Sequence, residues 1–188
     1  YYESCDLLMG ISKQTVNINK LVLKDCDNSK RVFRYVPHGL KHDGRDSYIP
    51  LDENDEGMLS FRKKFFKINN NKDVDFVLFF NSRNIRRKQI PDAMMAYRSF
   101  LDSLPKEKAA KTRFILHTEG STDAGTDLYA VKEYLFDESY HDNIVFSHEK
   151  LTREQLNYLY NIADVQILLT SNEGWGLTIT EAILAGTP

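Results

Sequence analysis

Short apolar runs alternate with amphipathic stretches four times after residue 73, and this alternation restricts the chain to few folds. We predict strands over residues 75–81, 113–118, 143–147 and 164–171. The first run is almost continuously apolar, as expected of a parallel strand that is buried on both faces. Strands that alternate with helices form a parallel sheet with helices on its faces. The sequence therefore predicts an α/β fold with a doubly wound, Rossmann-like parallel sheet.

The amphipathic stretches carry residues that begin and end helices. Pro91 stands at a tolerated first-turn position of the first helix. Thr152 and Gln155 have the spacing of a capping box at the start of the third. Gly186 is placed to end the last helix. We predict helices at about 91–101, 127–136, 153–160 and 177–185.

The first third of the chain follows a different pattern. Residues 6–11 predict a strand, which a helix of mixed polarity follows, and residues 34–40 predict a strand and a turn. The stretch 51–57 is rich in Asp, Glu and Asn and is a candidate linker. We therefore divide the chain into residues 1–57, the end of one domain plus the linker, and residues 58–188, a second domain. The chain starts without Met and stops directly after a helix, so we expect both ends to be truncated.

Composition excludes several classes of partner and setting. The formal net charge is -2 with both signs interspersed, so there is no electrostatic drive toward nucleic acid. No apolar run approaches the ~20 residues that span a bilayer, and we expect no transmembrane segment. Cys5 and Cys26 are too few for a secreted disulfide framework. We expect a cytoplasmic setting, either free or peripheral to a membrane.

The usual signatures of nucleophilic and metal-dependent enzymes are missing from the sequence. It shows no Ser-His-Asp or Cys-His arrangement and no cluster with metal-ligand spacing. His117 and His148 stand at the ends of two predicted strands, where a histidine is more often a hydrogen-bonded structural residue than a base. We therefore expect neither a cofactor nor a metal ion.

The segment 171–181 has the composition of a ligand-binding loop. It joins the carboxyl end of a strand to the start of a helix, which is where open α/β sheets place ligands. Gly174 and Gly176 permit close approach of the backbone, and the free amides of the helix start favour a phosphate. Glu173 and Glu181 can both face this cleft and accept hydrogen bonds from hydroxyl groups.

Two carboxylates beside a diphosphate would repel it unless cations intervene, because unit charges ~4 Å apart interact by several kcal/mol at a protein-like dielectric. The loop 81–89 supplies cations at the same edge of the predicted sheet. These cations are Arg83, Arg86, Arg87 and Lys88. Carboxylates for hydroxyl groups and cations for phosphates together predict a site for a nucleotide sugar.

Residues 161–188 closely resemble the Glu-x7-Glu region of the retaining glycosyltransferases of the GT-B fold (glycosyl transferases group 1, family 4-like). The resemblance is strong from residue 143 onward and loose before residue 73. Arg83 and Lys88 match the Arg and Lys that bind the donor diphosphate in the C-terminal domain of this family. Gln89 replaces the Gly that usually follows the Lys, which leaves open whether Lys88 or Arg87 takes the role of the lysine.

The resemblance implies transfer of a sugar from a nucleoside-diphosphate sugar to an acceptor hydroxyl, with retention of configuration. It implies that Glu173 holds the transferred sugar, that Glu181 holds the ribose diol, and that no metal is needed. The acceptor, a carbohydrate, a lipid-linked molecule or a protein, would bind to the N-terminal domain, so this chain alone would be inactive. The implied donor-binding residues are Arg83, Lys88, Glu173, Gly174, Gly176, Leu177, Thr178 and Glu181, of which Glu173, Arg83 and Lys88 are catalytic.

Other functions remain as alternatives to sugar transfer. A nucleotide-sugar epimerase or a phosphorylase of the same fold would share the phosphate-binding loops but not the pair of carboxylates. A dinucleotide-dependent oxidoreductase would need Gly-x-Gly-x-x-Gly after the first strand, and the loop 81–89 contains no glycine. A non-catalytic donor-binding remnant is the third alternative, against which the presence of both carboxylates and Arg83 argues.

Overall fold

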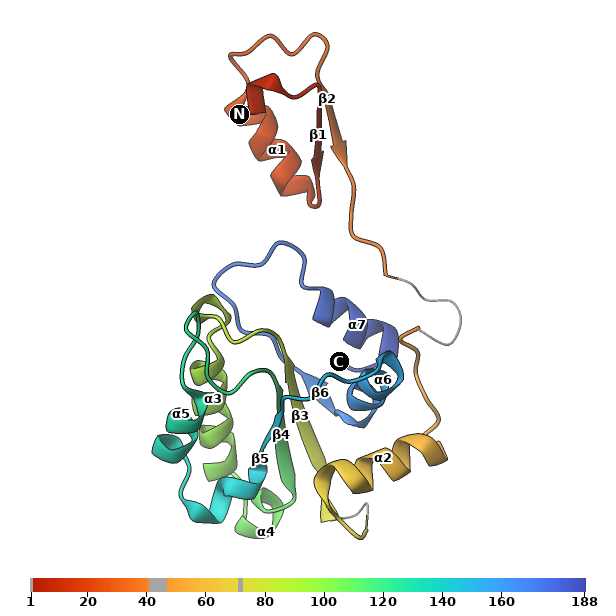
Figure 1. Cartoon of the computed structure of the whole chain (residues 1–188), viewed down its shortest axis with the longest axis vertical. Helices are drawn as coiled ribbons and strands as arrows, with labels where there is room; N and C mark the ends of the chain where they lie inside the picture. Colours follow the sequence, from red (N-terminus) through yellow and green to blue (C-terminus); the bar gives the residue numbers. More distant parts are fainter. Residues whose placement is uncertain (1, 41–46, 71–72) are drawn as a thin grey trace. The chain divides into compact units, whose positions relative to one another are not determined.

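The computed structural model describes residues 2–40, 47–70 and 73–188 (Figure 1). Its contacts divide the chain into two units. The first unit comprises Tyr1–Leu40 with Glu173–Leu177, and the second comprises Lys41–Asn172 with Thr178–Pro188. The domain division at residue 57 stays a prediction.

The first unit contains a strand, a helix and a second strand. After a short 3-10 helix η1 (Tyr2–Ser4), it consists of β1 (Leu7–Gly10), α1 (Lys13–Val22) and β2 (Val32–Tyr35). The two strands pair in parallel with Leu7 opposite Val32. Ser12 caps α1, because its side chain accepts a hydrogen bond from the Thr15 amide. The predicted order of elements is confirmed, although the second strand begins at Val32 and not at residue 34.

The second unit is built on a parallel four-stranded sheet. Its strands are β3 (Phe76–Asn81), β4 (Thr112–His117), β5 (Ile144–Ser147) and β6 (Val165–Gln166). They lie in the order β5-β4-β3-β6, and all neighbours are parallel. The order reverses beside β3, since β4 lies on one side of it and β6 on the other. This is the topological switch point where doubly wound sheets bind ligands. The predicted doubly wound sheet is confirmed.

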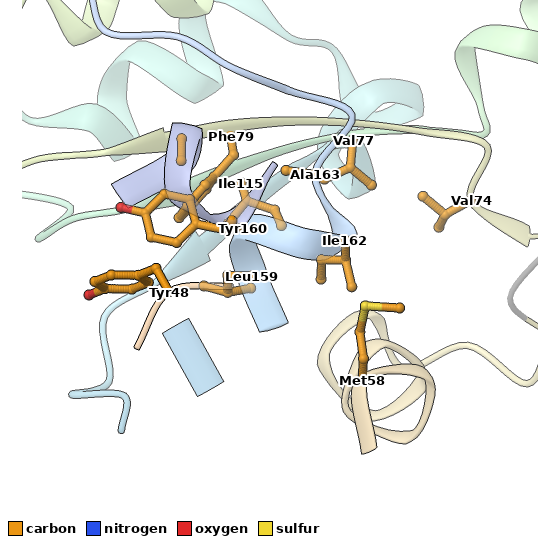
Figure 2. Packing of buried hydrophobic residues seen from close by; sticks show 12 residues of the cluster. Tyr48, Met58, Val74, Val77, Phe79, Ile115, Leu159, Tyr160, Ile162 and Ala163 are labelled. Carbon is orange, nitrogen blue, oxygen red and sulfur yellow. The ribbon is translucent and has the colours of Figure 1, made fainter. Parts of the chain in front are cut away.

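Helices cover both faces of this sheet (Figure 1). Successive strand residues point to opposite faces, so Val77 and Phe79 enter one apolar cluster while Phe80 enters the other. The cluster with Val77 and Phe79 includes side chains of α6 and is drawn in Figure 2. The other cluster includes α3 and α5, which pack against each other. The elements are α2 (Glu56–Phe66), η3 (Arg86–Lys88), α3 (Ile90–Asp102), α4 (Lys106–Ala109), α5 (Leu128–Leu135), η4 (Glu138–Asn143), α6 (Arg153–Ile162) and α7 (Leu177–Ala185).

The helix boundaries follow the signals in the sequence. Thr152 and Gln155 form both hydrogen bonds of the predicted capping box. Pro91 lies in the first turn of α3. Gly186 follows α7 with φ +83°, the left-handed conformation that commonly ends a helix at glycine. These three predictions are confirmed.

Two predictions about element lengths differ from the structure. The strand predicted at 164–171 is paired only at Val165–Gln166, with two flanking bonds of 2.9 Å, from the Asp164 amide to the Val77 carbonyl and from the Ile167 amide to the Phe79 carbonyl. The chain then leaves the sheet, because the Ser171 amide bonds to the carbonyl of Arg87 in another loop. The candidate linker at 51–57 ends inside α2, where the side chain of Asp55 caps the helix by accepting from the Met58 amide.

Candidate functional site

Loops that follow β3, β4, β5 and β6 meet at one edge of the sheet. Because all four strands are parallel, their carboxyl ends lie on the same side. The loop after β3 contains η3 and the four predicted cations.

Asn84 joins the loop after β3 to the loop after β4. Its Nδ2 donates to the carbonyls of Glu119 at 3.1 Å and Thr126 at 2.7 Å, and its Oδ1 accepts from the Thr126 amide at 3.1 Å. Gly125 lies so close that a Cβ there would be 2.2 Å from Asn84 Oδ1. Asn84 is only 3% exposed, so this side chain is a buried hydrogen-bonding centre. Sequence reasoning missed it, since a polar residue among cations gives no signal of burial.

Arg87 joins the same loop to the loop after β6. Its carbonyl accepts a 2.9 Å hydrogen bond from the Ser171 amide. Its guanidinium donates to the carbonyl of Asn172 and to Oγ1 of Thr170, the latter at 3.4 Å. The strands β3 and β6 flank the switch point, so Arg87 connects the two loops between which a ligand is expected.

The predicted cations differ in their exposure. Arg83 and Arg87 are exposed, whereas Lys88 is buried and only 7% exposed. Gln89, the residue that replaces glycine, has φ 47° and ψ 39°. This is the left-handed region, which a non-glycine residue occupies at a cost of roughly 1–2 kcal/mol. The structure thus gives a physical reason why glycine would suit this position.

Glu181 lies in the second unit, near the carboxyl end of β3. Its Oε2 accepts a 2.6 Å hydrogen bond from the hydroxyl of Tyr160, which in turn accepts a 2.9 Å bond from Nδ2 of Asn81. Asn81 is the last residue of β3. Burial, followed by the charge of Glu181, raises the pKa of Tyr160. Two bonds therefore connect Glu181 to the strand that leads into the cationic loop.

Tyr48 is a second phenol near Glu181. Burial raises the pKa of Tyr48 to about 12, and the negative charge of Glu181 contributes to this increase. The guanidinium of Arg153 lies 5.4 Å from the centre of its ring. Figure 2 shows the hydroxyl groups of Tyr48 and Tyr160 directed to the same side of the apolar cluster. From the sequence, Tyr160 is predicted only as the last residue of the helix at 153–160, and Tyr48 carries no signal.

The segment Glu173–Leu177 belongs to the first unit. Gly176 has φ +83°, a conformation that favours glycine, and is buried. The ring of Trp175 meets His38 edge-on at 5.9 Å. Glu173 is exposed. Arg83, Lys88, Thr178 and Glu181 all belong to the second unit, while a shared cleft between Glu173 and Glu181 stays a prediction.

The two histidines at the carboxyl edge make hydrogen bonds to their surroundings. Nδ1 of His117 lies 2.9 Å from Oγ of Ser147, and burial lowers the pKa of His117. His148 bonds to the Thr118 carbonyl and to the Tyr129 hydroxyl, each at 3.0 Å. These contacts agree with the structural role expected for both rings.

Within residues 2–40, 47–70 and 73–188, no group of three or more His, Cys, Asp or Glu side chains is arranged to hold a metal ion. In the same part of the chain, no helix has the length and apolar character required to cross a membrane.

The sequence model of the family "Glycosyl transferases group 1" matches residues 61–188. The chain belongs to this family. The comparison with curated protein sequences gave no match. The family match covers all strands of the second unit and the loops described above.

Solved structures similar to this glycosyltransferase chain show the same fold. A sucrose-phosphate synthase from Thermosynechococcus elongatus has a TM-score of 0.67 at 19% identity, over 100% of this chain and 40% of that one. An α,α-trehalose-phosphate synthase (UDP-forming) from Burkholderia xenovorans has a TM-score of 0.69 at 13% identity, over 97% and 44%. The catalytic domain of starch synthase IV from Arabidopsis thaliana, bound to ADP and acarbose, has a TM-score of 0.61 at 14% identity, over 97% and 38%.

These similarities confirm the predicted GT-B fold of the glycosyltransferase chain. The chain spans less than half of the length of each of the three structures. At such low identities the similarity establishes a shared fold. It does not establish that this chain shares the substrates of those proteins.

Proposed function

We propose that the complete protein transfers a sugar from a nucleoside-diphosphate sugar to an acceptor hydroxyl, with retention of configuration. The observation that carries this proposal is the arrangement at the switch point of a chain of this family. There the cationic loop after β3 is bonded through Arg87 to the loop after β6, and Glu181 lies near the end of β3. Cations for a diphosphate and a carboxylate for hydroxyl groups are thus available at one edge.

In this proposal, Arg83 and Lys88 neutralise the charge that develops on the leaving diphosphate. Fixed cations aimed at developing charge are often the largest contribution to catalysis. We assign the second cationic contact with the diphosphate, beside that of Arg83, to Lys88 and not to Arg87. The guanidinium of Arg87 already donates hydrogen bonds to Asn172 and Thr170. Arg87 would then keep the loop after β6 in place. The amides of Gly176, Leu177 and Thr178 would add donors at the helix start.

The two carboxylates are proposed to bind the sugar parts of the donor. Glu173, supported by the backbone of Gly174, would hold hydroxyl groups of the transferred sugar, and Glu181 would hold the ribose diol. A carboxylate can accept a hydrogen bond on each oxygen, which suits a pair of neighbouring hydroxyls. Neither group needs to act as a nucleophile, and the fixed cations make a cofactor or divalent metal unnecessary in this scheme.

The ligands of the similar proteins support a nucleoside diphosphate but leave its base open. One of them is described as UDP-forming, and another was solved with ADP. The acceptor, a carbohydrate, a lipid-linked molecule or a protein, would bind largely outside residues 1–188. We therefore expect no turnover from these residues alone.

A donor screen on the complete protein tests the proposal. UDP-, ADP- and GDP-sugars are incubated with an acceptor pool, release of the nucleoside diphosphate is followed, and the anomeric configuration of the product is determined by NMR. We expect release with one donor, a product of unchanged anomeric configuration, and a strong loss of donor affinity in Glu181→Ala. Epimerised sugar without any glycosylated product would instead support an isomerase, and unchanged affinity in Glu181→Ala would refute the ribose contact.

A further inference from the structure

The hydroxyl of Tyr160 lies between a strand end and a helix of the candidate site. It donates to Oε2 of Glu181 in α7 at 2.6 Å and accepts from Nδ2 of Asn81 at 2.9 Å. Asn81 ends β3, the central strand beside the switch point. The phenol therefore fixes the carboxylate of Glu181 relative to the strand that leads into the cationic loop.

The apolar core holds the ring of Tyr160 in one place. Tyr160 is 0% exposed, and its ring meets Phe79 and Tyr48 edge-on with centroid distances of 5.3 Å and 5.4 Å (Figure 2). Protein interiors are close-packed, so this ring has no space in which to swing away. The direction of the hydroxyl is consequently set by the core.

The direction of the hydrogen bond is also fixed. Burial and the charge of Glu181 raise the pKa of Tyr160, so the phenol keeps its proton. The amide of Asn81 supplies a donor to the phenol oxygen, which leaves the phenol proton for the carboxylate. A hydrogen bond to a carboxylate is charge-assisted and stronger than a bond between neutral groups.

This bond leaves acceptor positions of the carboxylate available to a ligand. An ionised carboxylate has about four acceptor positions, of which Tyr160 takes one on Oε2, while the Tyr48 hydroxyl also interacts with Glu181. A free glutamate side chain loses rotamer freedom when it binds, and a side chain that is already held loses less. Pre-orientation of Glu181 should therefore increase the affinity for a ligand that it contacts.

We propose that Tyr160 is a positioning residue of the donor site, which orients Glu181 to accept hydrogen bonds from the ribose diol of a nucleoside diphosphate. The inference rests on the proposed function, in which Glu181 contacts the ribose. It adds a residue that touches no substrate and acts through the carboxylate.

Tyr160→Phe in the complete protein tests this role, with Tyr97→Phe as the matched control. Tyr97 is 1% exposed, and its hydroxyl bonds to Oγ1 of Thr112 at 2.7 Å. Both variants therefore remove one hydrogen-bonded hydroxyl from a buried ring. Calorimetry measures the affinity for whichever of UDP, ADP and GDP the unmodified protein binds. The 2′,3′-dideoxy form of the same nucleotide, which lacks the diol, is measured in parallel.

We expect Tyr160→Phe to weaken binding of the ribonucleotide about tenfold, the size of effect that one charge-assisted hydrogen bond can have. Binding of the dideoxy form should be unchanged in this variant. In denaturant, Tyr97→Phe should lose about as much free energy of unfolding as Tyr160→Phe. Its affinities for the ribonucleotide and for the dideoxy form should equal those of the unmodified protein. Should Tyr160→Phe not fold, Asn81→Ala keeps the ring and should weaken ribonucleotide binding about threefold.

Three results would overturn the inference. Equal affinity of Tyr160→Phe and the unmodified protein for the ribonucleotide would reject it and leave the proposed function intact. Equal losses for the ribonucleotide and the dideoxy form would also reject it, because the site as a whole would then be disturbed. If the unmodified protein bound none of the three nucleotides, the proposed function itself would fail, and the inference with it.

Discussion

The Ser171 amide donates a 2.9 Å hydrogen bond to the carbonyl of Arg87, and so joins two loops that are 84 residues apart in sequence. The guanidinium of Arg87 adds a second connection through the Asn172 carbonyl. A site at this edge therefore depends on contacts between distant segments as well as on the charges of the loop itself.

Arg87→Ala should loosen the loop after β6. The guanidinium bonds to the Asn172 carbonyl and to Thr170 would be lost, while the backbone bond from Ser171 can persist. We expect faster amide hydrogen exchange around residues 170–172 and a loss of global stability below about 1 kcal/mol, because Arg87 is exposed. Arg86→Ala, in the same exposed turn, is the control. Unchanged exchange in Arg87→Ala would contradict the proposed role of this residue.

Asn84→Ala should destabilise the second unit by about 1–3 kcal/mol. The side chain of Asn84 is buried and bonds to the carbonyls of Glu119 and Thr126 and to the Thr126 amide, and all three groups would lose this partner. Urea-induced unfolding measures the change. Asn54→Ala, at an exposed position, should stay within about 0.5 kcal/mol of the unmodified protein. A similar small effect at Asn84 would show that the connection to the loop after β4 is unimportant for stability.

Gln89→Gly should stabilise the protein by about 1 kcal/mol. Gln89 has a φ of 47°, where glycine has no steric penalty, and the relief outweighs the extra entropy of a glycine in the unfolded chain. Lys67→Gly, with φ 54° at the end of α2, should act in the same direction. Ser99→Gly inside α3 is the opposite control and should destabilise. Thermal unfolding distinguishes these outcomes, and a lower midpoint for Gln89→Gly would be inconsistent with strain at this residue.

The stability of the second unit should decrease in mild acid because of His117. Burial lowers the pKa of His117 below its ordinary value of 6.5, so the unfolded chain takes up this proton at a higher pH than the folded one. The contribution of neutral His117 to the free energy of unfolding is thus fully present above about pH 6.5. It is lost as the pH falls through and below that value. His117→Asn should show a smaller loss of unfolding free energy between about pH 7.5 and about pH 5.5. Parallel pH profiles for both proteins would exclude His117 as the cause.

The strands and helix ends of the second unit could be predicted because their signals are local. The apolar run of β3 follows from burial on both faces, and the capping box at Thr152 is formed by neighbours in sequence. The end of β6 could not be predicted in this way. Ile167 and Leu168 continue the apolar pattern and pack against the core, yet pairing stops because the chain turns toward Arg87.

Within the candidate site, residue types could be predicted, but their partners could not. Arg83, Lys88 and Glu181 were identified by charge and spacing, which the sequence displays directly. Asn84 and Tyr160 act through contacts with residues 20 or more positions away. Such contacts depend on how the strands are ordered in the sheet, and the same residue types occur elsewhere in the chain without them.

Tyr160 has its ring in the apolar cluster and its hydroxyl at the candidate site. Attempts to engineer a more heat-resistant variant commonly begin by repacking such a cluster, and natural proteins accept many of these changes. Here a larger or smaller side chain next to Phe79 would tilt the ring and redirect the hydroxyl. Thermostabilisation of this protein should therefore leave that face of the sheet untouched and begin at Gln89 and Lys67, where a change of backbone strain does not move the phenol.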